Sequence, residues 1–476
     1  MILAILLLAF ILRLILLNQS LWLDEAIEVL AVKNTQYSAL ITQYSLGDFH
    51  PPLYHLILKF WTGFVGFTEV GARSFSVFTG IATVFVIFLI GKELKSAKLG
   101  FFSALFLATA PLHIYYSQEA RMYSLVTLFV ATLIYFFLKI LKSSNLIYWF
   151  LFTITLILIF YTDYIPYLIL VPLNSYVFWL VLSGAEGQRK NLKARFLINW
   201  SASQLIGFLF LIPWLPFLAK QLGVGIQTAQ MFPIWGETVG GFDPKAIPVT
   251  IAKFIVGRVS LYNKLFYAGL LVLPTIYFAL LTIRALFEKE KEKVLIFFWL
   301  TIPIIVGFLI SIFIPVFSYF RFLFVLPAMY LLLAAGILSF KNLKVQTILV
   351  TFVLITNLAS QIIFWVNPRF HRENWRGAVS YIETNSGQNS AVVFVNFAQT
   401  APYQYYARSV PFLGPDEWLD KNIQTIWLSR YVQPIFDPAV KVRKQIESVG
   451  FVKIEEKDFT GVVIWRYQKV FAQQLN

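Results

Sequence analysis

Long apolar stretches recur along this chain from residue 2 to about residue 366, and they constrain its fold more than any other feature. Each stretch is close to the length of about 20 residues that an α-helix needs to cross a bilayer. The chain is 58% hydrophobic and only 13% charged, whereas a soluble domain is about a quarter charged. We therefore predict a polytopic α-helical membrane protein.

The apolar pattern predicts about eleven transmembrane helices. They are expected near residues 2–17, 74–91, 99–115, 122–140, 146–162, 165–183, 196–218, 266–284, 294–315, 322–340 and 347–366. The apolar N-terminus has no basic leader and no clear small-residue cleavage site, so we interpret it as a retained span rather than a signal peptide.

Basic residues mark every second connection between the predicted spans. They lie in segments 92–98, 139–145, 184–195, 284–293 and 341–346, whereas the short connections near 113–121, 163–165 and 316–321 carry few. The positive-inside rule places the basic segments and the N-terminus in the cytoplasm of a plasma or inner membrane. The same rule places the stretch "LWLDEA" outside. Much of the net charge of +15 therefore sets the topology, which argues against nucleic-acid binding.

The composition divides the chain into two parts. Residues 1–366 form the predicted membrane domain, with two long outer loops at 18–73 and 219–265. Residues 367–476 mix polar and apolar positions, with strand-like runs "AVVFV" and "GVVIWRY" and helix-like runs "NWRGAVSYIETN" and "AVKVRKQIESVG". They predict a small extracytoplasmic α/β domain. The chain has no cysteine, which excludes disulfides and thiolate chemistry.

Two adjacent acids, Asp24 and Glu25, follow the first predicted span. One interpretation is that they cap the helix that follows, because acids favour the positive end of a helix dipole. The other is a catalytic carboxylate at a cavity on the membrane surface, which takes the proton from an acceptor hydroxyl. The sequence around the pair leaves both open.

Histidine stands beside a rigid segment at the end of the first long loop. His50 lies next to Asp48 and directly before Pro51 and Pro52, which hold the chain extended. His50 is a candidate for binding an anionic group. His55, one turn into the next helix, fits a packed interfacial residue better.

Further ionisable residues lie at the outer ends of the predicted spans. His113, Glu119 and Arg121 share one outer connection, where ionisable residues between apolar helices suggest function; a local pair of Glu119 with Arg121 is the structural alternative. Arg321 is either a snorkelling side chain or a phosphate contact. Candidates with less support are Arg258, Tyr262 and Asp163, and Arg13 in the first span is expected to pair with an acid or a carbonyl.

A carboxylate, histidines and arginines at one membrane face suit a substrate whose lipid phosphate lies at the interface. A sugar on a polyprenyl phosphate is already activated, so its transfer needs only a base for the acceptor and cations for the departing phosphate. Neither a G-x-G-x-x-G motif nor a Walker A sequence is present, and this reaction requires neither.

Four motifs in order resemble the membrane-embedded GT-C glycosyltransferases, specifically glycosyltransferase family 39 and the ArnT-like proteins, which include dolichyl-phosphate-mannose protein mannosyltransferases. The motifs are "LWLDEA" in the first outer loop, "HPPLYH" at its end, "YSQEARMYSL" after the third span and "YFRFLFVLPAMYLLLAAG" near the tenth. Together they run from residue 1 to about residue 340. The resemblance implies a GT-C fold and an inverting sugar transfer from a polyprenyl-phosphate donor on the outer face.

The resemblance also implies roles for single residues. Asp24 matches the usual candidate base, with Glu25 supporting it. His50 matches a basic residue that contacts the donor phosphate, although related transferases often carry Lys there. Glu119 and Arg121 match the second-loop motif, and Arg321 matches the basic position before "LP".

Two other functions stay open at this point. A transporter or flippase for lipid-linked sugars would favour ionisable residues near the bilayer midplane and repeated halves, neither of which the sequence shows. A non-catalytic protein of glycan assembly would retain the fold without the reaction. The sugar and the acceptor, which could be a lipid, a glycan or a protein, are not specified by the motifs. The sequence identifies no definite cofactor. The acid pair and the histidines could bind a divalent metal, for which no spacing here is diagnostic.

Overall fold

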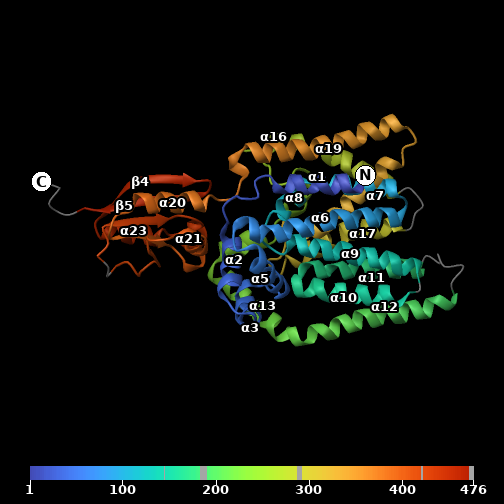
Figure 1. Ribbon diagram of the computed structural model, residues 1–476, viewed down its shortest axis with the longest axis horizontal. Helices are drawn as coiled ribbons and strands as arrows, with labels where there is room; N and C mark the ends of the chain where they lie inside the picture. The colour runs from blue at the N-terminus through green and yellow to red at the C-terminus, as the bar shows by residue number, and fades with distance from the viewer. Residues whose placement is uncertain (144, 183–189, 287–291, 420–421, 471–476) are drawn as a thin grey trace.

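The computed structural model describes residues 1–143, 145–182, 190–286, 292–419 and 422–470. It has a long bundle of helices and, at one end of the bundle, a small domain built around a sheet (Figure 1). The N-terminus lies at the end of the bundle away from this sheet domain. The predicted cytoplasmic residues Arg189, Lys289 and Lys291 lie outside the described residues.

The helical part begins with α1 (Ile2–Leu14), α2 (Leu23–Asn34), α3 (Tyr37–Ala39), η1 (Leu40–Tyr44), α4 (Ser45–Asp48), α5 (Leu53–Val65), α6 (Glu69–Leu94), α7 (Ala97–Thr109), α8 (Pro111–Ser117), α9 (Tyr123–Lys142) and α10 (Leu146–Thr162). It continues with η2 (Ile165–Ile169), α11 (Leu170–Leu182), α12 (Lys190–Leu211), η3 (Ile212–Trp214), α13 (Leu215–Met231), α14 (Pro233–Gly240), α15 (Ala246–Val256), α16 (Lys264–Leu286), α17 (Glu292–Ile310), η4 (Tyr319–Val325), α18 (Leu326–Leu338) and α19 (Leu343–Val366).

The predicted polytopic helical fold is confirmed. Within the described residues, 8 helices are long and apolar enough to cross a membrane, or up to 9 if the bent pair α7–α8 is one span. This pair bends by 65° at Pro111, which can begin a helix but lacks the N–H that would continue one. The predicted span at 99–115 therefore corresponds to this bent pair rather than to one continuous helix. The predicted spans at 2–17 and 146–162 form α1 and α10, which are apolar but shorter.

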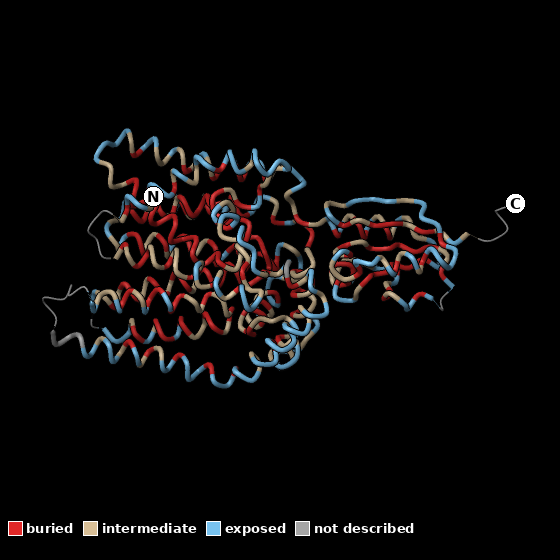
Figure 2. The backbone as a smooth tube through the Cα atoms, turned by 180° about the vertical axis from the view of Figure 1, so that it is seen from behind, coloured by how far each residue is buried: buried red, intermediate tan, exposed pale blue. Residues whose placement is uncertain are grey.

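Burial separates the helices that face lipid from those that form the core. Only 11% of the most apolar window of α16 is buried inside the protein, whereas 89% of the window in Tyr319–Leu338 is buried. Figure 2 shows the same contrast between the exposed outer helices and the buried centre. An apolar helix that the rest of the protein leaves exposed is stable only against lipid.

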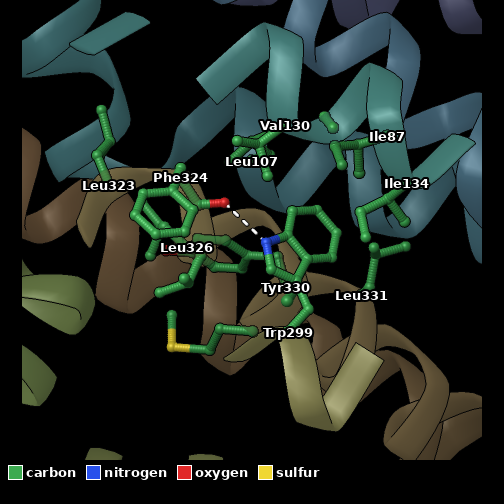
Figure 3. Close-up of a cluster of buried hydrophobic side chains, with 14 of the residues drawn as sticks. Ile87, Leu107, Val130, Ile134, Trp299, Leu323, Phe324, Leu326, Tyr330 and Leu331 are labelled. Carbon is green, nitrogen blue, oxygen red and sulfur yellow. Dashed lines mark hydrogen bonds between the residues drawn. The ribbon is translucent and has the colours of Figure 1, made fainter. Parts of the chain in front are cut away.

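The centre of the bundle is closely packed around α17 and α18. Trp299 is fully buried, and its indole N–H donates to the backbone carbonyl of Phe324 over 3.0 Å (Figure 3). Around the ring pack side chains of α6, α9 and α18, among them Ile87, Ile134 and Leu331.

The sheet domain contains η5 (Pro368–Phe370), α20 (Trp375–Asn385), β1 (Ser390–Phe394), η6 (Phe397–Gln399), α21 (Ala401–Tyr406), β2 (Phe412–Leu413), β3 (Thr425–Ser429), α22 (Gln433–Phe436), α23 (Lys441–Ser448), β4 (Phe451–Phe459) and β5 (Val462–Lys469). Its 5 strands follow the order β2-β1-β3-β5-β4. Strand β1 is parallel to β2 and β3, whereas β5 is antiparallel to β3 and β4.

The four predicted segments of this domain form α20, β1, α23 and β5. Strand β4 was missed because it lies at the edge of the sheet and most of its side chains are exposed. Its sequence "FVKIEEKDF" therefore lacks the apolar alternation that marks a half-buried strand.

Side chains of the sheet domain bond directly to the long loop between α1 and α6. The Tyr406 hydroxyl accepts a hydrogen bond from the backbone N–H of Leu21 over 2.9 Å, and the Tyr405 hydroxyl donates to the carbonyl of Phe67 over 2.7 Å. Arg376 forms an ion pair with Glu69, at the start of α6. These contacts hold the sheet domain against the segment that carries Asp24.

Candidate active site

Helix α2 turns its two first-turn acids toward different surroundings. Asp24 and Glu25 both lie in that turn, where the helix dipole favours a negative charge. Successive helical residues point about 100° apart. Asp24 accordingly faces a cavity, while Glu25 is fully buried. Helix capping explains why two acids are stable in this turn. It does not explain why one of them lines a cavity and the other is buried.

A cavity of about 520 Å³ is lined by both the helical part and the sheet domain. Its aromatic lining consists of Trp22, Tyr115, Tyr116, Tyr123 and Phe320, and its charged lining of Asp24, Glu119, Arg258, Arg369, Arg372, Glu373 and Asp458. Concave sites with aromatic walls and a few convergent polar groups are typical of small-molecule binding. Of the predicted site residues, Asp24, Glu119 and Arg258 line this cavity.

Glu25 is bound to Arg73 of α6. The guanidinium donates to the carboxylate over 2.8 Å through Nε and 2.5 Å through Nη2, and the backbone N–H of Ala120 donates to it over 2.8 Å. Burial opposes ionisation of Glu25, but Arg73 and Arg372 lower its pKa below the ordinary value. Glu25 therefore stays ionised and links three segments of the chain.

Asp24 has a looser environment, in which its side chain remains 38% exposed. Arg121 is the nearest cation, with 3.9 Å between its Nη2 and the Asp24 Oδ2. Burial within the cavity raises the pKa of Asp24 above its ordinary value, and Arg121 partly opposes this shift. A carboxylate with a raised pKa and an exposed edge is suited to accept a proton.

Arg121 also contacts Asp48, which lies beside both predicted histidines. The Nη1 of Arg121 is 3.3 Å from Asp48 Oδ1, and the His50 Nδ1 is 2.9 Å from Asp48 Oδ2. Burial opposes ionisation, but Arg121 and His50 hold the pKa of Asp48 well below its usual range. His50 therefore has a carboxylate partner in Asp48 and lies outside the cavity lining.

His55 belongs to a buried group that could hold a metal ion. Its Nδ1 lies 2.8 Å from Glu28 Oε1, and its Nε2 lies 3.4 Å from Asp48 Oδ2 without forming a hydrogen bond. Potential ligand atoms of Glu28, Asp48 and His55 lie within 4.8 Å of one another. Carboxylate oxygens and imidazole nitrogens suit Zn²⁺ or Mn²⁺, so the chemistry of this group fits a divalent cation.

Glu119 contacts the sheet domain rather than Arg121. Its Oε2 accepts from Arg372 Nη1 over 2.8 Å, while Arg372 also lies 3.9 Å from Glu25. Burial raises the pKa of Glu119, and Arg372 opposes the shift. The predicted local pair of Glu119 and Arg121 is therefore absent from the described ion pairs, because each residue has a partner from another part of the chain.

The remaining predicted residues divide between the cavity and the scaffold. Arg258 donates to the hydroxyl of Tyr319 over 2.7 Å. Tyr262 is exposed and lies against the guanidinium of Arg369. Arg321 donates to the backbone carbonyls of Pro315 and Val316 and does not line the cavity.

His113 lies outside the cavity lining and contacts Arg13 of α1. It is fully buried, and its Nδ1 lies 2.7 Å from Nη2 of Arg13, which also donates to the carbonyls of Ala9 and Ala108. A charged side chain inside a membrane span is costly unless it has polar partners, and Arg13 has two backbone carbonyls as partners, as the sequence predicted. Asp163 is also buried and contacts the backbone N–H of Ile165.

Sequence reasoning missed Arg73, Arg369, Arg372 and Glu373. A signal existed for Arg73, since a lone arginine at the start of an apolar helix requires a partner. Arg369, Arg372 and Glu373 form a charged run directly after the last span. They line the same cavity as Asp24 because the sheet domain packs against the helical part. The sequence of this charged run alone does not predict that packing.

Residues 49–217 match the family described as dolichyl-phosphate-mannose-protein mannosyltransferase. This segment contains "HPPLYH" and "YSQEARMYSL". No curated protein matches the chain by sequence.

Solved structures share the fold at low identity. ArnT from Cupriavidus metallidurans in the apo state has a TM-score of 0.58 at 11% identity, over 98% of this chain and 97% of its own. The same protein bound to undecaprenyl phosphate has a TM-score of 0.57 at 10% identity, over 99% and 98% of the two chains. The archaeal oligosaccharyltransferase AglB from Archaeoglobus fulgidus, in complex with an inhibitory peptide and a dolichol-phosphate, has a TM-score of 0.55 at 11% identity, over 98% of this chain and 74% of its own.

The similarity extends over nearly the whole chain of ArnT, including the part that follows the last span. The TM-score of 0.58 over nearly both chains shows a shared fold, and at 11% identity the substrates have to be inferred from the site itself. The resemblance predicted from the four motifs is therefore confirmed: this chain has the fold of GT-C glycosyltransferases and carries a match to the dolichyl-phosphate-mannose-protein mannosyltransferase family over residues 49–217.

Proposed function

We propose that this protein transfers a sugar from a polyprenyl-phosphate donor to an acceptor hydroxyl at the outer face of the membrane. The observation that carries the proposal is that Asp24 and Arg258 line one cavity. A carboxylate can take the acceptor proton, and a guanidinium can stabilise the charge on the departing phosphate. The aromatic residues of the same cavity offer faces on which sugar rings can pack.

The proposed reaction is one displacement. The acceptor oxygen forms a bond to the anomeric carbon as the bond between that carbon and the phosphate oxygen breaks. The acceptor proton passes to Asp24, and polyprenyl phosphate leaves with the electron pair. Because attack comes from the side opposite the leaving group, the configuration at the anomeric carbon is inverted.

Two structures of similar fold support the choice of donor, since one ArnT structure holds undecaprenyl phosphate and one AglB structure holds a dolichol-phosphate. The proposal includes the orientation predicted from the loop charges. The N-terminus then lies in the cytoplasm, and the cavity and the sheet domain lie outside a plasma or inner membrane.

A divalent cation is a separate part of the proposal. Glu28, Asp48 and His55 would hold it, and when bound it would supply positive charge beside Arg121. Metal analysis of the purified protein tests this part, with loss of bound Zn²⁺ or Mn²⁺ expected in E28Q. If the wild-type protein binds neither ion, the proposed metal site is contradicted. The proposed role of Asp24 does not depend on that result.

The transfer is tested by a donor screen in proteoliposomes, with mass spectrometry of the glycosylated product. Mannose, glucose, aminoarabinose and galactosamine on undecaprenyl phosphate are suitable donors. We expect D24N to lower the transfer rate about 10²- to 10⁴-fold, while D416N, at an exposed position of the sheet domain, leaves it unchanged. Equal transfer by D24N and wild type would show that Asp24 is not the base. No transfer by the wild type from any donor would contradict the proposed function.

A further inference from the structure

Arg369 lies where the last span meets the sheet domain. It belongs to η5, directly after α19 ends at Val366. Its side chain is exposed and lines the same cavity as Asp24 and Arg258. No motif in the sequence pointed to this residue, because it follows the segment that carries them.

The guanidinium of Arg369 is held by an aromatic ring rather than by an acid. Its Cζ lies 3.4 Å from the centroid of the Tyr262 ring and 5.8 Å from that of Phe370. Within the described parts of the chain, its guanidinium forms no ion pair and no hydrogen bond. Stacking fixes the plane of a guanidinium while its N–H edge stays available.

The other arginines near Asp24 differ in this respect. Arg372 is paired with Glu119, and Arg121 is paired with Asp48 and Asp24. Both of these charges are therefore largely neutralised inside the protein. Of the arginines that line the cavity, Arg258 and Arg369 are the two without a carboxylate partner among the described residues. Unpaired cations in a cavity are available to an anionic ligand.

We propose that Arg369 binds the phosphate of the lipid donor together with Arg258, and that Tyr262 is the residue that positions it. This inference rests on the proposed function, since it assigns the phosphate site of that reaction. A planar guanidinium can donate two parallel hydrogen bonds to a phosphate, and such charged bonds are stronger than neutral ones. Tyr262, a candidate substrate-binding residue from the sequence, would then act indirectly. Its ring lies outside the cavity lining and holds Arg369 in position.

The test uses full-length protein in nanodiscs, with undecaprenyl phosphate as the probe and the neutral alcohol undecaprenol as its matched ligand. We expect R369Q to weaken undecaprenyl phosphate binding at least about tenfold and to leave undecaprenol binding unchanged. R369K keeps the charge but loses the planar fork, so its affinity should fall between those of wild type and R369Q. R408Q, at an exposed arginine of the sheet domain that does not line the cavity, serves as the control.

Tyr262 has its own pair of variants. Y262F keeps an aromatic face and should bind the probe as the wild type does, whereas Y262A should lose about threefold in affinity. An unchanged affinity in R369Q, or an equal loss for both lipids, would overturn the inference. A wild type that does not prefer undecaprenyl phosphate over undecaprenol would instead contradict the proposed donor, so the two failures can be told apart.

Discussion

Asp24 and Glu25 are neighbours on one helical turn, yet the pKa values of their carboxyls shift in opposite directions. Burial raises that of Asp24, whose cation Arg121 is 3.9 Å away. Burial opposes ionisation of Glu25 as well, but Arg73 in direct contact lowers its pKa. Asp24 therefore accepts a proton more readily than an ordinary aspartate, while Glu25 holds its negative charge to lower pH than an ordinary glutamate.

The shift at Asp24 predicts the pH dependence of transfer. A general base must be ionised, so kcat/KM should rise with pH through the pKa of Asp24. Since that pKa is raised, the rise should lie above the ordinary aspartate value of about 3.9. Arg121 lowers the pKa of Asp24, so R121Q should move the rise to higher pH.

The profile would be measured with saturating donor and compared with that of R443Q, at an exposed surface pair. A rise at the same pH in R121Q and wild type would contradict the assignment of Asp24. A shift in R443Q would mean that the effect is one of net charge alone.

At the scale of elements, the ion pair of Glu25 and Arg73 fixes α2 against α6. Both side chains are fully buried, and Arg73 also donates to the backbone carbonyls of Leu17, Gln19 and Ser20. One arginine therefore holds the chain between α1 and α2 in place. The position of Asp24 follows from this contact, because Asp24 lies in the first turn of the same helix.

Removing Arg73 alone should be strongly destabilising. R73M leaves Glu25 buried without its main partner, which typically costs about 3–5 kcal/mol. The double variant R73M/E25Q should recover part of this loss because no charge is then left unpaired. Denaturant or thermal unfolding in detergent measures the difference. R376Q, which breaks the partly exposed pair with Glu69, should cost less than about 1 kcal/mol.

Acidification provides a second test of the same pair. The pKa of Glu25 is lowered in the folded protein, so its contribution to stability is present above the unfolded pKa of about 4.3. It is lost as the pH falls through the folded value. R73M should therefore show a weaker loss of stability on acidification than the wild type, and an equal dependence would contradict the anchoring role.

At the scale of the whole molecule, the sheet domain completes the cavity from outside the helical bundle. Arg369, Arg372, Glu373 and Asp458 line the same cavity as Asp24. The sheet domain lies at the end of the bundle away from the N-terminus (Figure 1). The proposed orientation therefore predicts that the cavity, the sheet domain and the first loop share one side of the membrane.

Cysteine labelling tests this orientation directly, because the chain has no cysteine of its own. R408C in the sheet domain should react with a membrane-impermeant maleimide in intact cells. K344C, at the exposed start of α19, should react only after permeabilisation. The reverse pattern would place Asp24 on the cytoplasmic side and contradict the proposed topology.

The sequence alone determined the class of fold and the order of its parts. Apolar runs of membrane length do not require knowledge of tertiary contacts, because each run satisfies its own backbone as a helix. The four motifs likewise indicated the GT-C fold. Strand β4 was not predicted because an edge strand need not alternate in polarity. The bend at Pro111 was not predicted either, because both sides of it are apolar and together have the length of one span.

Only the tertiary structure decided which charges meet. Asp24 and Glu25 are adjacent in the sequence, and the geometry of α2 places Asp24 at the cavity and Glu25 in the interior. Arg321 fits a phosphate contact by its place in a motif, but its guanidinium donates to nearby carbonyls. Arg369 had no motif and reaches the cavity because the chain folds back after α19. Electrostatic partners are set by distance and burial, and contacts between distant segments arise only when the helices and the sheet domain pack together.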